Sequence, residues 1–215
     1  MNILTSSLPE TVDISGTDWP INTGFYTGVE FELLMQDHAL NDEERLSRAL
    51  SLYYPTLPPD LAAALDRLLW FYSCGRYKEQ KAPTEETPAK LKKRKKKAYD
   101  FDQDADLIFA AFWAVYGIDL NAVEDLHWWK FRALFSALPS ECEFCKVMGY
   151  RTMDTKGLSK KQKQHYEKMR QLYALKNEVD VGAAMTLVER NQRMRDYVDR
   201  RFAEIEGRTE WTSTP

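Results

Sequence analysis

The stretch that decides the fold runs from Tyr99 to Arg151 and reads YDFDQDADLIFAAFWAVYGIDLNAVEDLHWWKFRALFSALPSECEFCKVMGYR. Large aromatic side chains are concentrated in it, namely Phe101, Phe109, Phe112, Trp113, Trp128, Trp129, Phe131, Phe135 and Phe144. Aromatic residues bury large apolar areas, so this density predicts the core of the protein. The stretch contains no catalytic signature, and residue chemistry alone indicates a helical protein.

Apolar periodicity divides this stretch into helices. The segment from Leu107 to Tyr116 is apolar nearly all round and ends at Gly117, and its helical phasing assigns Trp113 to the core. A second helix, Leu126 to Leu138, is apolar on two sides and is predicted to be contacted on both. Trp128 and Trp129 point about 100° apart on a helix, so both are predicted to pack in the core rather than form a ligand site.

Helix starts are predicted from capping boxes, in which a side chain and a residue three positions later satisfy each other's backbone. Four pairs fit this pattern: Asn41 with Glu44, Asn121 with Glu124, Ser140 with Glu143, and Ser159 with Gln162. The third is predicted to open a short helix that ends near Gly149. Aspartates at positions 100, 102, 104 and 106 are predicted to favour a helix start through the helix dipole.

The N-terminal region is predicted to combine a hairpin with helices. Residues 11–21 alternate around Ser15-Gly16-Thr17, which predicts two short strands with Pro20 at a strand end. Helices are predicted over Phe25–Ala39, from Asn41 to Tyr54, and after Pro58-Pro59-Asp60 as far as Gly75. The last of these is predicted to bury Leu61, Leu65, Leu68, Leu69 and Tyr72.

The whole chain is therefore predicted to be mainly α, a compact helical domain with a small N-terminal β-hairpin and a C-terminal helical arm. Residues 1–75 form the hairpin and three helices, 76–98 a basic mobile linker, and 99–178 the aromatic-rich helical core, which packs with 1–75 as one domain. Residues 179–215 form a C-terminal helix, about Val181 to Glu206, and a frayed tail.

Charge is unevenly distributed along the 215 residues. Residues 1–75 hold 3 basic and 11 acidic groups, whereas residues 76–97 hold 10 basic and 3 acidic. The basic side chains gather at Lys90, Lys92, Lys93, Arg94, Lys95, Lys96 and Lys97. This block is a candidate contact for an acidic partner or a solubilising linker. Nucleic-acid binding is the weaker alternative, because no aromatic residue interleaves the block and the rest of the chain is acidic.

Several site hypotheses fail on their own requirements. Asp100-Asp102-Asp104 resembles a calcium loop, but Ala105 and Ala111 stand where that loop needs Gly and Glu. Cys142 and Cys145 have zinc or redox spacing without a second ligand pair or a βαβ unit, so they are interpreted as half-buried thiols. Phosphate loops and hydrolase motifs are absent. We predict no enzyme activity, no cofactor and no metal.

The sequence also predicts no membrane segment. The longest apolar run, Leu107 to Tyr116, is about half of the roughly 20 residues that span a bilayer. No signal peptide is visible at the N-terminus, and the three cysteines do not make a disulfide framework, which favours a reducing cytosol.

The central stretch resembles a family of small proteins from long-tailed phages and prophages of Gram-positive bacteria. The resemblance rests on a Tyr-Asp-Phe opening, a helix ending Tyr-Gly-Ile-Asp-Leu and a Leu-His-Trp-Trp-Lys-Phe helix, and it covers about residues 10–175. The preceding lysine run and Pro20–Thr23 also fit. The matched motif residues include Tyr99, Asp100, Phe101, Tyr116, Gly117, His127, Trp128, Trp129 and Phe131.

Such proteins are encoded between the tail-tube and tape-measure proteins, and the resemblance implies a non-enzymatic tail assembly chaperone. Its expected partners are the tape-measure protein and other tail proteins, with self-association left open, and its expected location is the cytoplasm of the host bacterium during phage assembly. A structural component of the finished tail is the first alternative. A nucleic-acid-binding adaptor acting through Lys90–Lys97 is the second.

Overall fold

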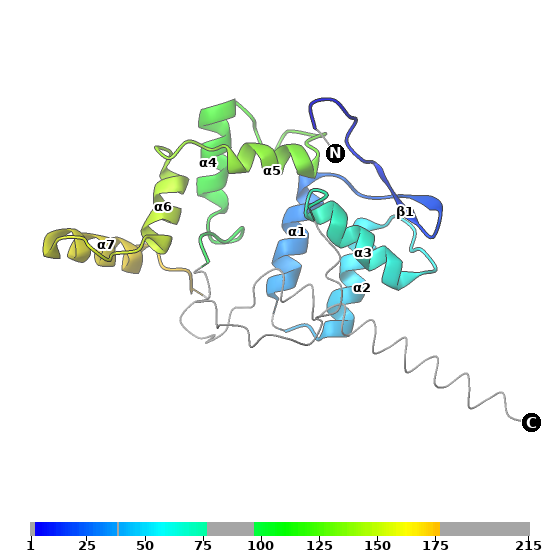
Figure 1. Cartoon of the computed structure of the whole chain (residues 1–215), viewed down its shortest axis with the longest axis horizontal. Helices are drawn as coiled ribbons and strands as arrows, with labels where there is room; N and C mark the ends of the chain where they lie inside the picture. The colour runs from blue at the N-terminus through cyan, green and yellow to red at the C-terminus, as the bar shows by residue number, and fades with distance from the viewer. Residues whose placement is uncertain (1–2, 38, 77–96, 177–215) are drawn as a thin grey trace, which may run out of the picture. The chain divides into compact units, whose positions relative to one another are not determined.

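The computed structural model describes residues 3–37, 39–76 and 97–176. Its strands are β1 (Thr11–Ile14) and β2 (Thr17–Pro20). Its helices are α1 (Phe25–Gln36), α2 (Asp42–Tyr53), α3 (Leu61–Tyr72), α4 (Ala105–Tyr116), α5 (Trp128–Ser136), α6 (Glu143–Thr152) and α7 (Lys160–Leu172) (Figure 1). The predicted fold class, mainly α with a small N-terminal hairpin, is confirmed. Residues 77–96 of the predicted linker (76–98) and the predicted C-terminal helix lie outside the described residues.

The described residues fall into two compact units. The first contains residues up to 76 together with Leu126–Lys130, and the second contains residues 97–125 and 131–176. Helix α5 therefore begins in the first unit and ends in the second. No helix in the described part of the chain is long and apolar enough to cross a membrane.

The hairpin has the predicted position and turn. β1 pairs with β2 in antiparallel register, with Ile14 opposite Thr17, and the turn residues Ser15 and Gly16 have φ values of 52° and 82°. Two positive φ values in succession match the right-handed twist of a hairpin. Val12 and Ile14 are buried, and the Ser15 hydroxyl donates a hydrogen bond to Asp60 at 3.1 Å. The hairpin is thereby attached to the start of α3.

Helices α2 and α3 start at side-chain caps. Asn41 and Glu44 form the predicted capping box of α2, and the Asp60 side chain accepts a hydrogen bond from the backbone of Ala63 at the start of α3. The apolar stripe of α3 is buried as predicted except for Leu61, which is 37% exposed because it occupies the first residue of the helix. Helix α1 ends at Gln36, earlier than predicted.

The aspartates before α4 do not act simply as dipole partners. Asp100 and Asp104 are buried, and only Asp106 lies within the first turn of the helix. The Asp100 carboxylate accepts hydrogen bonds from the backbone N–H groups of Asp102 and Gln103, at 2.8 and 3.0 Å. The turn before α4 is therefore built by a buried carboxylate. The predicted stop at Gly117 is confirmed, with a left-handed φ of 65°.

Helix α5 starts two residues later than predicted and without the capping box assigned to Asn121 and Glu124. Asp119 organises that turn instead, since its carboxylate accepts from the Asn121 backbone at 2.9 Å. At the actual start of α5 the His127 ring nitrogen Nδ1 accepts a hydrogen bond from the backbone N–H of Trp129 at 3.0 Å. A histidine therefore satisfies one of the free donors at this helix start.

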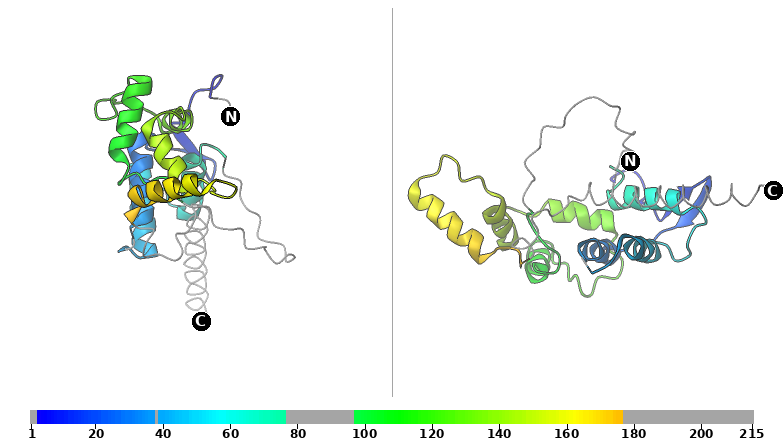
Figure 2. Two further views of the ribbon diagram at one scale, coloured as in Figure 1. Left: turned by 90° about the vertical axis from the view of Figure 1, so that its left-hand side faces the viewer. Right: turned by 90° about the horizontal axis from the view of Figure 1, so that it is seen from below.

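The two C-terminal helices of the described chain differ in how well their starts were predicted. The Ser140–Glu143 capping box does not form, because Ser140 donates to Glu141 and the sulfur of Cys142 accepts from the backbone of Cys145. Helix α6 also continues past Gly149 to Thr152. For α7 the predicted Ser159–Gln162 capping box is present. α7 packs against α6 (Figure 2).

Candidate protein-interaction surface

The basic block singled out from the sequence is described only at its last residue. Lys90, Lys92, Lys93, Arg94, Lys95 and Lys96 lie outside the described residues. Lys97 is half-buried, and its amino group forms an ion pair with the Asp100 carboxylate. Burial alone raises the pKa of Asp100, but the bond from Lys97 and the two backbone N–H groups outweigh burial and lower it below its ordinary value. Lys97 thus stabilises the turn before α4.

The Tyr99-Asp100-Phe101 motif builds an aromatic cluster in the second unit. The Tyr99 ring meets the edges of Phe101, Phe135 and Phe144 with ring centroids 5.3, 5.0 and 6.2 Å away. Its hydroxyl accepts a hydrogen bond from Arg132 at 3.2 Å. These contacts are those of core packing, and they fix the segment that leads into α4.

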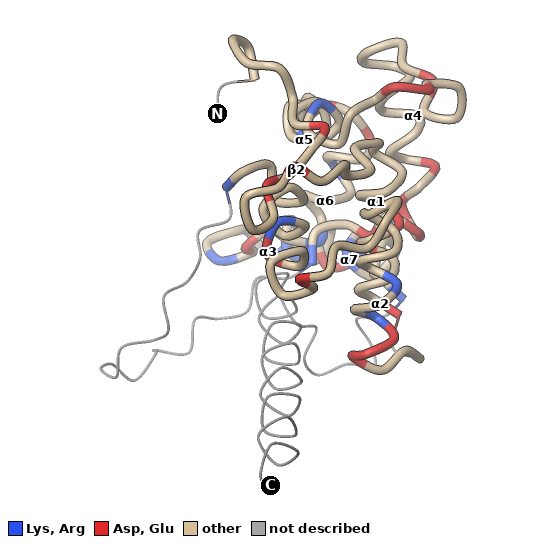
Figure 3. The backbone as a smooth tube through the Cα atoms, turned by 90° about the vertical axis from the view of Figure 1, so that its right-hand side faces the viewer, with Lys and Arg blue, Asp and Glu red and all other residues tan. Residues whose placement is uncertain are grey.

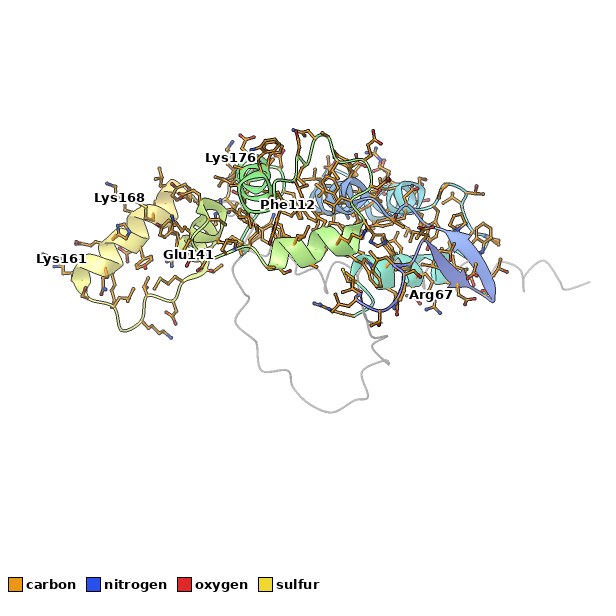
Figure 4. All side chains as sticks on the ribbon, turned by 90° about the horizontal axis from the view of Figure 1, so that it is seen from above. Arg67, Phe112, Glu141, Lys161, Lys168 and Lys176 are labelled. Atoms are coloured by element: carbon orange, nitrogen blue, oxygen red, sulfur yellow. The ribbon has the colours of Figure 1, made fainter. Side chains whose placement is uncertain are left out.

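The Tyr-Gly motif and Phe131 connect α4 to α5 within the second unit. The Tyr116 hydroxyl donates to the Leu134 carbonyl at 2.8 Å, and Gly117 ends α4. Phe112 lies between the two helices (Figure 4) and stacks on Phe131, with centroids 5.0 Å apart and planes inclined by 11°. The motif therefore holds two helices together rather than lining a ligand site.

The His-Trp-Trp motif closes the C-terminal end of α3 in the first unit. The indole N–H of Trp128 donates to the Tyr72 carbonyl at 2.8 Å, and that of Trp129 donates to the Phe71 carbonyl at 2.7 Å. The last carbonyls of a helix lack partners within it, and the two indoles donate to two of these carbonyls. The Phe71 carbonyl also accepts a hydrogen bond from the backbone N–H of Cys74 at 3.0 Å. Both tryptophans are buried, as predicted.

One buried ion pair was missed by the sequence reasoning. The guanidinium of Arg151 binds both oxygens of Asp104, at 2.6 and 2.8 Å, and also donates to the carbonyls of Tyr173 and Ala98. A single side chain thus ties α6 to the start of α4, to the segment before it and to the end of α7. The local sequence gives no sign of this pair, because Arg151 lies in a short helix that also carries Glu143 and Lys146, and Asp104 is 47 residues away.

The thiols occupy structural positions. Cys142 accepts a backbone hydrogen bond at the start of α6, and the Cys145 thiol donates to the Leu138 carbonyl at 3.7 Å. The pKa of the Cys145 thiol is raised to about 11, mainly by burial and to a smaller extent by the neighbouring Cys142. Both are half-buried, as predicted. Within the described ranges no group of three or more His, Cys, Asp or Glu residues is arranged to hold a metal ion.

Helix α4 carries an exposed apolar surface, and this surface corrects the core assignment of Trp113. Trp113 is 55% exposed and Val115 37% exposed, because only Ile108, Ala111 and Phe112 face the interior. No charged residue occurs from Leu107 to Ile118. We refer to the exposed residues Ala110, Trp113, Ala114 and Val115, with the half-buried Phe109, as the α4 apolar face.

The α4 apolar face has the composition of a protein-binding surface. The rings of Phe109 and Trp113 stack, with centroids 6.3 Å apart and planes inclined by 19°. The cores of protein interfaces are rich in aromatic side chains and poor in charged ones, and contiguous exposed apolar patches mark interaction sites. The geometry offers a ridge for an apolar partner, and no catalytic constellation accompanies it in the described residues.

Comparison with known proteins identifies the protein family. Residues 4–175 match the family described as Bacteriophage Gp15 protein, which is most of the chain. The chain therefore belongs to this bacteriophage protein family. Searches among curated proteins and among solved structures each gave no match.

Proposed function

We propose that the protein is a non-enzymatic tail assembly chaperone that binds the tape-measure protein in the host cytoplasm and assists assembly of the tail tube around it. The observation that carries this proposal is the α4 apolar face, which exposes an aromatic pair on a helix without charges. Membership of a bacteriophage protein family supports a role in phage assembly. The tape-measure partner rests on the resemblance of the Tyr99–Arg151 stretch to tail-region proteins.

The proposed mechanism is the covering of apolar helix surface. A long helical tape-measure protein presents apolar stripes before it is enclosed by the tube, and such stripes aggregate unless another surface covers them. Helices recognise grooves and ridges through apolar side chains at helical spacing, which Ala110, Trp113 and Ala114 provide at positions i, i+3 and i+4. No group has to be activated and no bond changed.

The test is co-expression with the tape-measure protein encoded by the same phage. We expect a soluble, co-purifying complex with the unaltered chain and loss of that complex with Trp113→Glu, which introduces a charge into the aromatic pair. A central aromatic residue of an interface contributes about 2 kcal/mol or more, so binding should weaken at least about thirtyfold. The matched control is Tyr26→Glu, an exposed aromatic of the first unit that is 47% exposed.

Other outcomes support other functions. No complex and no gain in tape-measure solubility with the unaltered chain would refute the chaperone proposal. Recovery of the protein from purified virions in stoichiometric amount would favour a structural tail component. DNA binding whose salt dependence falls when the Lys90–Lys97 block is neutralised would favour the nucleic-acid adaptor.

A further inference from the structure

Within the described residues, helix α7 contacts the second unit along the side that faces α6. Its inner side meets α6 through the rings of Tyr166 and Tyr173, which lie 6.1 and 5.9 Å from the ring of Tyr150. Arg170 adds a hydrogen bond to the Met153 carbonyl at 2.8 Å. No residue of α7 is buried. The α7 residues at positions 160–165, 167, 168, 171 and 172 are exposed.

The open side of α7 is strongly basic. Residues 154–176 contain seven basic and two acidic side chains, and Glu167 is the single acidic residue of α7 itself. Lys161 and Lys168 lie seven positions apart, which places them on one face of the helix (Figure 4). Among the described residues, no ion pair includes Lys160, Lys161, Lys163 or Lys168. All four of these lysines are exposed.

The complementary charge lies on the first unit of the same chain. The described residues of that unit hold 11 acidic and 5 basic side chains. Four of the acidic ones, at positions 37, 42, 43 and 44, form what we call the acidic corner, between α1 and α2 and in the first turn of α2 (Figure 3). Arg45, the basic residue beside them, is already held by Asp42 and by the carbonyls of Asp37 and Leu40.

The acidic corner differs from the other aspartate-rich segment. Before α4, Asp100 and Asp104 are buried in bonds to Lys97 and Arg151, so they are not available to a partner. At the acidic corner Asp37, Glu43 and Glu44 are exposed. Each copy of the chain therefore carries an exposed basic helix on one unit and an exposed acidic corner on the other.

We propose that α7 is a docking arm whose basic face binds the acidic corner of a second copy of this chain. Two different surfaces meet in such a contact, so it is heterologous and repeats head to tail, giving a ring or an open chain of copies. A second copy fits better than nucleic acid, because the described residues outside 154–176 hold 20 acidic and 9 basic side chains and would repel a polyanion. This inference is independent of the tape-measure proposal.

The test is sedimentation velocity of the full-length protein over a range of concentrations. At about 0.1 M ionic strength we expect self-association, and at about 1 M, where the screening length falls to about 3 Å, we expect mostly single copies. Lys161→Glu with Lys168→Glu should weaken the association at least about tenfold, and Asp37→Lys with Glu43→Lys should do the same. Circular dichroism verifies that both variants are folded.

Mixing the two variants gives the decisive result. The arm with reversed charge in one variant is then complementary to the corner with reversed charge in the other, and the unaltered arm is complementary to the unaltered corner. Association should therefore return in the mixture, although each variant alone does not associate. The matched control, Lys130→Glu with Lys146→Glu, makes the same change of net charge on α5 and α6 and should associate as the unaltered chain does.

Three results would overturn the proposal. The first is a single copy at both ionic strengths, and the second is failure of the mixture to associate. The third is an α7 variant that associates normally but loses binding to duplex DNA or to the tape-measure protein, which would assign the arm to that partner instead.

Discussion

At the scale of single residues, Gly28 and Trp128 show how closely the core of the first unit is packed. A methyl group built on Gly28 would lie 2.1 Å from Cε3 of the Trp128 ring, and Trp128 is fully buried. Glycine is a poor helix former, yet α1 needs it at this position because any side chain would displace the tryptophan. The sequence shows a glycine in a helix, and only the structure gives the reason.

We predict that Gly28→Ala destabilises the protein. Overpacking a core costs about 1–3 kcal/mol, and a methyl group only 2.1 Å from a buried ring belongs at the upper end of that range. That cost exceeds the gain of about 1 kcal/mol from replacing a helical glycine. Urea unfolding measures the difference. Gly149→Ala is the matched control, since nothing lies within 4 Å of its added methyl group in α6, and it should stabilise. Equal effects of the two substitutions would contradict this account.

The ring of His127 is held in one tautomer by two hydrogen bonds. Nε2–H donates to the Pro9 carbonyl at 3.1 Å, and Nδ1 accepts from the Trp129 backbone at 3.0 Å. Protonation of Nδ1 would remove the second bond. Burial is the largest effect and lowers the pKa of His127 below its ordinary value. The bond to the Pro9 carbonyl, which is the next largest effect, opposes it, Lys130 adds to the lowering and Glu10 opposes it.

From this pKa shift we predict that stability falls in mild acid. The unfolded state binds a proton near pH 6.5 and the folded state only at lower pH, so the stabilisation is complete above about pH 6.5 and is lost as the pH falls toward the folded pKa. Unfolding free energies of the wild type and of His127→Ala, measured from pH 7.5 to 5, provide the comparison. The variant should be less stable at pH 7.5 and depend less on pH; parallel curves would refute the prediction.

At the scale of elements, helix starts were predicted well where the cap is local and chemically suited. The capping boxes of Asn41 with Glu44 and of Ser159 with Gln162 form as predicted, because the two residues of each pair lie within one helical turn of each other. Asn121 and Ser140 carry the same signal, but Asp119 and Glu141 offer their carboxylates to these residues first. Short-range competition between polar side chains, which the capping pattern does not include, decided those cases.

The Arg151–Asp104 pair holds several elements of the second unit together, and we predict a large cost for removing it. Arg151→Met leaves the Asp104 carboxylate buried without its cation, which costs about 3–5 kcal/mol. Lys146→Met is the control on the same helix, because its pair with Glu143 is exposed at 3.7 Å and is worth about 1 kcal/mol at most. Thermal and urea unfolding measure both.

A second substitution separates the contribution of the ion pair to stability from that of the other contacts of Arg151. Adding Asp104→Asn to Arg151→Met removes the stranded charge while keeping an acceptor for the Asp100 backbone, and should recover part of the lost stability. Additive losses in the double variant would show that Arg151 acts mainly through the carbonyls of Tyr173 and Ala98.

At the scale of the whole molecule, the first unit takes part of its core from a distant segment. Leu126–Lys130 belongs to this unit, the backbone of Trp128 donates to the Thr23 carbonyl at 2.7 Å, and that of Phe25 donates to the Leu126 carbonyl at 2.9 Å. Trp128 and Trp129 complete the end of α3. The N-terminal residues alone therefore lack part of their fold.

We predict that a fragment ending at residue 79 does not unfold cooperatively. Loss of one fully buried large aromatic side chain costs about 3–5 kcal/mol, a large share of the total stability of a small domain. The same fragment joined through a Gly-Ser linker to residues 119–138 should regain near-ultraviolet circular dichroism and a cooperative thermal transition. Indistinguishable transitions in the two fragments would show that Trp128 is dispensable.

The sequence by itself determined the hairpin, the helical class, most helix positions and the phage family, because turns, caps and apolar periodicity act over a few residues and the motifs are long. It also placed Trp128 and Trp129 correctly in the core. It could not place Trp113. A helix that is apolar all round gives no local signal for which side is covered, so only tertiary packing left Trp113 at the surface. The pairing of Arg151 with Asp104, 47 residues apart, was likewise decided by the approach of α6 to α4.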